Sequence, residues 1–143
     1  MTWSILVVDD SETSRSLLRT TLVAKGARVI EAENGKQGLL RARTDTVDLI
    51  FSDIHMPVMD GLQMIRELRM LREYEKTPIF VLTSDASGIR AAEGKNAGAT
   101  GWIVKPVNPE VLWKAVEKAL FGIPVQQGII VPTALGSSSS GQK

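Results

Sequence analysis

Short hydrophobic runs alternate with longer amphipathic stretches along most of the chain. Five runs are rich in β-branched and aromatic residues and predict buried strands: 5–8, 28–32, 47–53, 78–82 and 101–104. In the stretches between and after them, apolar residues recur three and four positions apart, which predicts helices over 12–25, 36–43, 62–72, 87–97 and 109–120. This alternation predicts a parallel sheet with helices on both faces, joined by right-handed crossovers. The expected fold is a three-layer α/β sandwich.

The predicted helix over 87–97 differs from the others. It contains Gly88 and Gly94 and has little apolar bulk beyond Ile89. A glycine inside a helix lowers the stability of that helix by roughly 0.5 to 1 kcal/mol relative to alanine. We therefore expect this segment to be the least stable helix and the one that moves.

Length and composition limit the number of domains, the partners that charge could attract and the expected cellular compartment. A chain of 143 residues suffices for one domain with a core. The 17 basic and 16 acidic residues give a net charge of +1, so charge offers no argument for binding nucleic acid or an anionic membrane. The chain has no cysteine, and its start shows no export signal. We expect a cytoplasmic protein.

Polar residues follow four of the five predicted strands: Asp9 and Asp10, Asp53, Thr83, and Lys105. The carboxyl ends of parallel strands share one edge of a sheet, where ligands of open α/β folds bind. Carboxylates held close together raise one another's pKa, and a divalent cation relieves that repulsion. Oxygen ligands without nearby histidine or cysteine side chains favour Mg²⁺.

The other two polar residues suit a phosphoryl group. Lys105 supplies a cation and Thr83 a hydroxyl, next to a carboxylate that can act as a nucleophile at Asp53. Taken singly, each has an ordinary explanation: acids near a helix start, a turn threonine, an exposed lysine. Taken together, they predict that Asp53 accepts a phosphoryl group as an acyl phosphate.

Several motifs resemble, in order and spacing, the receiver domain of bacterial two-component response regulators: LVVDDS at 6–11, DIHMP at 53–57, DG at 60–61, TS at 83–84 and GATGWIVKP at 98–106. The resemblance covers residues 4–121, so we expect a receiver domain over 1–121. It implies a flavodoxin-like (CheY-like) fold with five helices and strand order 2-1-3-4-5, an order that the hydrophobic pattern does not provide.

The resemblance also implies roles for individual residues. Asp53 matches the phosphoacceptor, and Thr83 and Lys105 match the hydroxyl and ammonium that bind the phosphate. The implied Mg²⁺ ligands are Asp10 and Asp53 directly, Asp9 through water, and the backbone carbonyl of His55.

The family's switch and tuning positions are also present. Thr83 and Trp102 match the pair that rearranges on phosphorylation, although Trp102 replaces the more usual tyrosine or phenylalanine. His55 and Asp85 occupy positions that tune the phosphate's lifetime, and Lys105-Pro106 resembles the family's cis peptide.

The expected function is a phosphorylation-dependent switch, acting without turnover of an external substrate. Its phosphoryl donor is expected to be a histidine kinase or phosphotransfer protein, and its output a protein contact. One alternative is a hydrolase of the haloacid dehalogenase type, but such enzymes need an acid where this chain has His55. Another is a flavin binder, whose phosphate Asp9 and Asp10 would repel.

The segment 122–143 lacks the periodic pattern and includes a Gly/Ser tract at 136–141. We expect a flexible tail or the remnant of a linker, so the chain is either a stand-alone regulator or a receiver cut from a longer regulator or hybrid kinase. A docking or dimerising role for the apolar residues 129–131 is the alternative.

Overall fold

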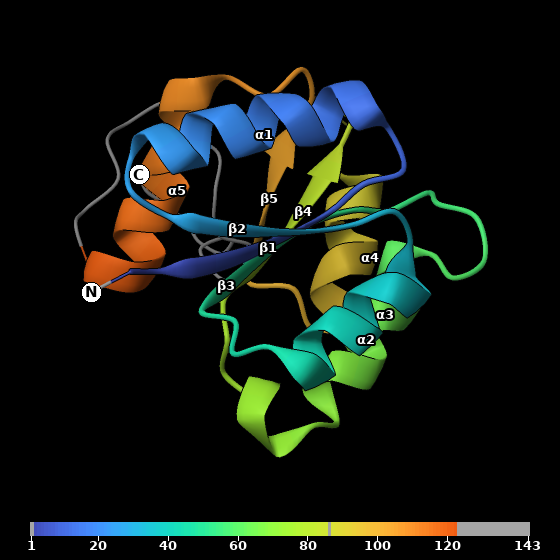
Figure 1. Ribbon diagram of the computed structural model, residues 1–143. Helices are drawn as coiled ribbons and strands as arrows, with labels where there is room; N and C mark the ends of the chain where they lie inside the picture. The colour runs from blue at the N-terminus through green and yellow to red at the C-terminus, as the bar shows by residue number, and fades with distance from the viewer. Residues whose placement is uncertain (1, 86, 123–143) are drawn as a thin grey trace.

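Five parallel strands form one sheet in the order β2-β1-β3-β4-β5. The computed structural model describes residues 2–85 and 87–122. The strands are β1 (Ser4–Val8), β2 (Arg28–Ala32), β3 (Leu49–Asp53), β4 (Ile79–Thr83) and β5 (Gly101–Val104). Figure 1 shows α1 and α5 on one face of the sheet and α2, α3 and α4 on the other. The predicted three-layer sandwich and strand order are confirmed.

The helices are α1 (Glu12–Ala24), α2 (Gly35–Thr44), α3 (Gly61–Arg69), α4 (Ile89–Ala97) and α5 (Pro109–Phe121), with a short 3₁₀ turn, η1 (Arg72–Tyr74), after α3. Most lie where the periodicity predicts them. The prediction for α4 starts two residues too early, because Gly88 has a left-handed φ of 94° and precedes the first helical residue. Only Gly94 is therefore an interior glycine of α4.

Both faces of the sheet are buried, each in its own hydrophobic cluster. Alternate residues of β1 point to opposite clusters: Leu6 and Val8 to the one under α2 and α3, Ile5 and Val7 to the one under α1 and α5. All four are fully buried, and burying such a side chain stabilises a fold by about 1.5 to 3 kcal/mol. The strands are thus held firmly from both sides, which fixes where their carboxyl ends lie.

Side-chain caps start four of the helices. Ser11, Asn34, Asp60 and Asn108 each accept a hydrogen bond from a backbone N–H in the first turn. Such caps satisfy donors that have no partner within the helix. Ser11 caps α1 directly after Asp9 and Asp10, so the loop that carries this acidic pair is anchored on both sides.

The predicted tail lies outside the described residues apart from Gly122, whose left-handed conformation ends α5. The boundary between a receiver domain over 1–121 and a tail over 122–143 thus stays a prediction. Across 2–85 and 87–122, every helix is too short or too polar to cross a lipid bilayer.

Candidate active site

The strand register brings the predicted polar residues to one edge of the sheet. Val8 pairs with Ser52, so Asp9 and Asp53 follow neighbouring positions on adjacent strands. Asp53 pairs with Leu82, one residue before Thr83. The Lys105 backbone N–H donates to the Thr83 carbonyl at 2.7 Å. The carboxyl ends of β1, β3, β4 and β5 therefore lie next to one another at this edge of the sheet.

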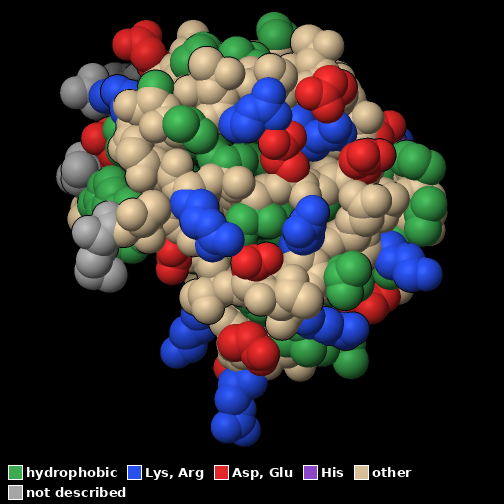
Figure 2. Space-filling view, viewed as in Figure 1, with side chains coloured by type: hydrophobic (Ala, Val, Ile, Leu, Met, Phe, Trp, Pro, Cys, Tyr) green, Lys and Arg blue, Asp and Glu red, His purple; other side chains and the backbone are tan. Residues whose placement is uncertain are grey.

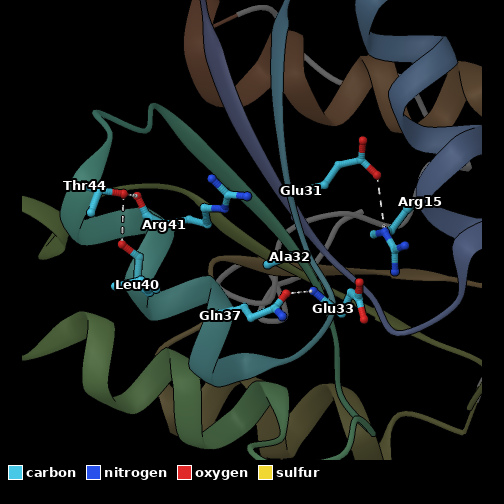
Figure 3. A pocket seen from close by; sticks show the side chains of 8 residues that line it. All are labelled: Arg15, Glu31, Ala32, Glu33, Gln37, Leu40, Arg41 and Thr44. Carbon is cyan, nitrogen blue, oxygen red and sulfur yellow. Dashed lines mark hydrogen bonds and ion pairs between the residues drawn. The ribbon is translucent and has the colours of Figure 1, made fainter.

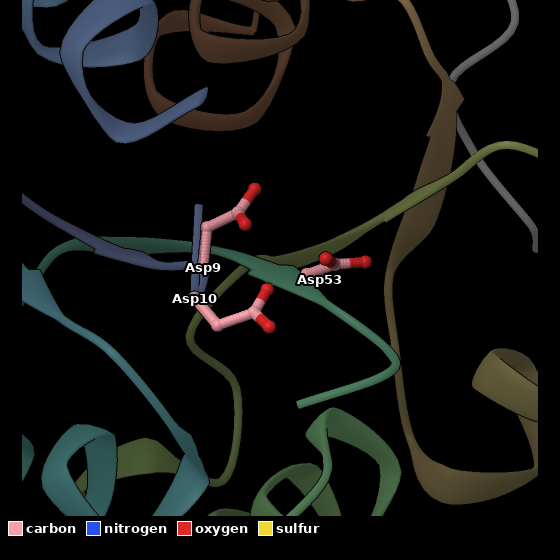
Figure 4. Close-up of side chains that lie close together, drawn as sticks. All are labelled: Asp9, Asp10 and Asp53. Atoms are coloured by element: carbon pink, nitrogen blue, oxygen red, sulfur yellow. The ribbon is translucent and has the colours of Figure 1, made fainter. Parts of the chain in front are cut away.

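Asp9, Asp10 and Asp53 form an acidic cluster, shown in Figure 4, in which one carboxylate oxygen from each lies within 4.8 Å of the others. Asp9 is fully buried, Asp53 half-buried and Asp10 exposed. The cluster is therefore open to solvent on one side and closed on the other. An ion or phosphoryl group approaching from solvent would meet Asp10 and Asp53 first.

One ammonium group faces this cluster. Lys105 Nζ lies 3.1 Å from Asp9 Oδ2 and 3.3 Å from Asp53 Oδ2. Three carboxylates and one ammonium leave the site two charges negative when all are ionised. An all-oxygen site with this excess charge fits a hard divalent cation such as Mg²⁺. Lys105 is joined to Pro106 by a cis peptide bond.

The protonation equilibria follow from burial and charge. Partial burial raises the pKa of Asp53, and the Asp9 charge adds to this, while Lys105 and the Ile54 N–H counteract it. Burial lowers the pKa of Lys105, but the charges of Asp53 and Asp9 outweigh it, so this pKa lies above its usual value. Asp53 is therefore more basic than an ordinary aspartate, and its neighbour Lys105 stays protonated.

The β3–α3 loop fixes the orientation of Asp53. Its Oδ1 accepts a hydrogen bond from the Ile54 N–H at 2.8 Å, and its backbone carbonyl accepts one from Ser52 Oγ at 2.7 Å. The Gly61 N–H donates to the Ile54 carbonyl. A Cβ at Gly61 would lie 2.0 Å from the Asp53 carbonyl oxygen. The DG motif at 60–61, which the sequence offered as part of the family resemblance, thus also leaves the room that Asp53 needs.

Arg15 supports the acidic pair, and sequence reasoning missed it. This buried side chain donates from Nη1 to the Asp9 carbonyl at 2.7 Å and forms ion pairs with Glu12 and Glu31. The Ser11 N–H also donates to Asp9 Oδ1. In the sequence, Arg15 is one of two arginines in an amphipathic helix, the other being Arg19. Nothing in the local pattern marks it as the buried one.

Thr83 is connected to α4. Its side chain is buried, and Oγ1 accepts a hydrogen bond from the Asp85 N–H at 3.0 Å. The Asp85 carboxylate in turn accepts from the Ser87 and Arg90 N–H groups, the latter in the first turn of α4. Hydrogen bonds from Ser87, together with Arg90, lower the pKa of Asp85. A displacement of Thr83 would therefore act on the start of α4 through Asp85.

The two remaining predicted positions lie at the periphery of the site. His55 is exposed in the loop after Asp53. Trp102 is half-buried on β5, where it pairs with Val81. It packs against the hydrophobic cluster that contains Leu6 and Val8, on the sheet face covered by α2, α3 and α4. Its ring is therefore on the sheet face that carries α4.

Comparisons with known proteins agree with this geometry. Residues 5–117 match the model of the response regulator receiver domain. A chemotaxis protein CheY homolog of Campylobacter jejuni is 35% identical over 118 residues, which are 81% of this chain and 91% of the homolog. The structure of the chemotaxis response regulator CheY4 of Vibrio cholerae has a TM-score of 0.80 and 41% identity, covering 84% of this chain and all of that one.

A further solved structure concerns the metal. The receiver domain of a sensor histidine kinase of Pseudomonas aeruginosa, with magnesium coordinated in its active site cleft, has a TM-score of 0.78 and 26% identity. The structural match covers 83% of this chain and 98% of that receiver domain. The family match spans most of the residues from β1 to α5. This chain therefore belongs to the response regulator receiver domain family, the CheY-like signalling switches of two-component systems.

Proposed function

We propose that this receiver domain is a phosphorylation-dependent switch in which Asp53 accepts a phosphoryl group from a phosphohistidine. The donor is a histidine kinase or a histidine phosphotransfer protein, and the output is a changed contact with a protein target. One observation carries the proposal: a half-buried carboxylate of raised pKa lies 3.3 Å from an ammonium group, beside two further carboxylates.

Asp10 and Asp53 are the residues proposed to hold Mg²⁺ directly, with Asp9 acting through a water molecule and the His55 backbone carbonyl as a further ligand. The three carboxylates supply the negative charge that such an ion needs. Bound there, Mg²⁺ would supply charge neutralisation between the cluster and the incoming phosphoryl oxygens.

The chain's own residues would carry the transfer. An Asp53 carboxylate oxygen attacks phosphorus, a C–O–P linkage forms, the P–N bond of the donor breaks, and the imidazole leaves with its electron pair and takes up a proton. Lys105, already directed at Asp53, offsets charge on the transferring group. Thr83 Oγ1 accepts one hydrogen bond from Asp85, which leaves its own proton available for a phosphoryl oxygen.

The added charge supplies the driving force for switching. A phosphoryl group brings about −1.5 to −2 charges at neutral pH. Movement of Thr83 toward that charge would pull on Asp85 and thereby on the start of α4. Trp102 lies on the same face of the sheet and would respond to space vacated near β4. By resemblance to the family, the proposed output surface is formed by α4, β5 and α5.

Acetyl phosphate with Mg²⁺ tests this proposal. We expect an intact mass increase of one phosphoryl group that hydroxylamine removes and that Asp53→Asn abolishes. Asp60→Asn is the matched control, since Asp60 caps α3 outside the acidic cluster. Phosphorylation of the Asp53→Asn protein to the same extent would refute the assignment. Continuous turnover of an external phosphoester by the unmodified protein would instead favour the haloacid dehalogenase alternative.

A further inference from the structure

Helix α2 presents an exposed leucine among cations that have no acidic partner. Lys36, Arg41 and Arg43 are all exposed, the helix contains no acidic residue, and none of the three forms an ion pair with any described residue. Leu40 lies between them with 61% of its surface exposed. Charged helix surfaces usually carry both signs, since opposite charges one turn apart stabilise a helix. This helix surface is basic and apolar instead.

A groove of about 620 Å³ runs between α2 and the β3–α3 loop. Its lining includes Lys36, Leu40, Arg43, Val58, Met59 and Glu67. In Figure 2, which is viewed as Figure 1, hydrophobic side chains over this loop and α2 lie beside Lys and Arg side chains. The groove is thus apolar along its length and predominantly basic at its rim.

Val58 lies in this groove in a strained conformation. Its φ of 70° places a β-branched residue in the left-handed region, and 77% of its surface is exposed. Burial therefore does not compensate for the strain. The loop is held in place by the Met59 N–H, which donates to the Pro57 carbonyl, and by the Gly35 N–H, which donates to the Met59 carbonyl. Strained backbone held in this way is concentrated at functional sites.

Lys36 is also unfavourable for local structure. It lies in the first turn of α2, where the helix dipole favours acidic residues, and α2 has none there. Lys36 and Val58 line the same groove. Residues that break a local structural preference are expected at functional or strained sites.

A second groove, of about 670 Å³, lies on the other side of α2 against β2 and α1, and Figure 3 shows Arg41 directed toward β2 within it. Gln37 and Leu40 line both grooves. Leu40 therefore forms a ridge between two hollows, a shape that suits an elongated ligand rather than a small molecule enclosed in a pocket. In the second groove Glu31 is neutralised by Arg15 and Arg19.

We propose that the α2 surface, defined as Lys36, Leu40, Arg43, Val58 and Met59, docks an acidic amphipathic segment of a partner protein. An apolar side chain of the segment packs on Leu40 and Val58, and its carboxylates pair with Lys36 and Arg43. A second copy of this chain fits poorly, because a two-fold contact would place the same cations against one another. The α2 surface is at the β2 edge of the sheet, away from the proposed output surface at β5.

The first test uses a synthetic helical peptide in which leucines recur four residues apart among glutamates. Backbone amide NMR shifts should be confined to residues 35–44 and 58–61. One control peptide has lysine in place of glutamate and another has serine in place of leucine. We expect each control to bind at least about tenfold more weakly. Shifts spread over the whole surface, equal binding of the basic peptide, or no binding would overturn the proposal.

Variants of the protein test the assignment to the α2 surface. Leu40→Ser, and separately Lys36→Glu with Arg43→Glu, should each weaken peptide binding about tenfold. Met70→Ser and Arg72→Glu, exposed residues outside both grooves, should leave it unchanged. All these variants should be phosphorylated by acetyl phosphate at the normal rate, which separates failure of docking from failure of the proposed function.

Val58→Asn is the sharpest variant, since asparagine tolerates the left-handed conformation better than valine. We expect it to raise the urea midpoint of unfolding while weakening peptide binding. Unchanged peptide binding by Val58→Asn would show that Val58 is not part of the α2 surface.

Other occupants of the α2 surface would give different results. Binding of phosphatidylserine vesicles without binding of the acidic peptide would assign the cations to a membrane, and concentration-dependent dimers abolished by Leu40→Ser would assign the surface to a second copy. Either result would overturn the proposal.

Discussion

Replacing Lys105 by methionine removes the ammonium group but keeps most of the side-chain volume. The two ion pairs that disappear are 3.1 Å and 3.3 Å long. At an effective dielectric constant of about 20, Coulomb's law assigns each contact an attraction of about 5 kcal/mol. Desolvation of the charges offsets most of this, and breaking a buried pair costs a net 3 to 5 kcal/mol or so.

The site is not fully buried, which reduces that loss. The Lys105 side chain is 20% exposed and that of Asp53 17% exposed. Water and dissolved ions therefore screen part of the interaction. We expect Lys105→Met to lower the free energy of unfolding by about 2 kcal/mol at pH 8 without Mg²⁺.

The loss should depend on pH in a defined direction. The pKa of Lys105 is raised, so in the unmodified protein its ammonium stays charged from pH 5 to 8 and its contribution is constant there. The pKa of Asp53 is already raised and rises further once the ammonium is gone. The folded variant then holds a proton more tightly than the unfolded chain, so its stability falls as pH rises through the folded pKa of Asp53. The destabilisation should be larger at pH 8 than at pH 5.

Urea unfolding followed by circular dichroism in EDTA measures this effect. Lys76→Met is the matched control, because it removes an exposed lysine that precedes β4, at the end of that strand opposite Thr83; it should change stability by less than about 0.5 kcal/mol. The reasoning is refuted if Lys105→Met costs no more than that control at pH 8. It is also refuted if the cost is the same at both pH values.

Four further outcomes are expected. Gly61→Ala should lower the free energy of unfolding by at least about 2 kcal/mol, because its Cβ would overlap the Asp53 carbonyl; a fully stable variant that is phosphorylated normally would contradict this. Tyr74→Phe should lower the free energy of unfolding by about 1 to 3 kcal/mol in thermal unfolding, since the single Tyr74 hydroxyl proton is shared between the Ala42 and Asp45 carbonyls at the end of α2; a smaller loss would mean that water replaces the hydroxyl. Arg15→Met should weaken Mg²⁺ affinity in a fluorescence titration by releasing the Asp9 carbonyl, whereas Arg19→Met should not. Mg²⁺ at one hundred times its dissociation constant should add about 2.7 kcal/mol of stability that EDTA removes, and Asp53→Asn should reduce this gain.

The sequence by itself determined the elements and predicted which polar residues lie at the carboxyl edge of the sheet. Hydrophobic periodicity is a local signal, so β1 to β5 and α1 to α5 were predictable from it. Because parallel strands end on the same edge, Asp53, Thr83 and Lys105 could be assigned to one site before any distance was known. The strand order followed from the family resemblance and not from the pattern.

Only the tertiary structure decided how charges pair and which residues are strained. Lys105 reaches Asp9, 96 positions away in the chain, as well as Asp53, and no local pattern states which acid a lysine will meet. The burial of Arg15 and the left-handed backbone of Val58 are likewise invisible in the sequence. Such features depend on distances between segments far apart in the chain, which are fixed only when the two hydrophobic clusters pack against the sheet.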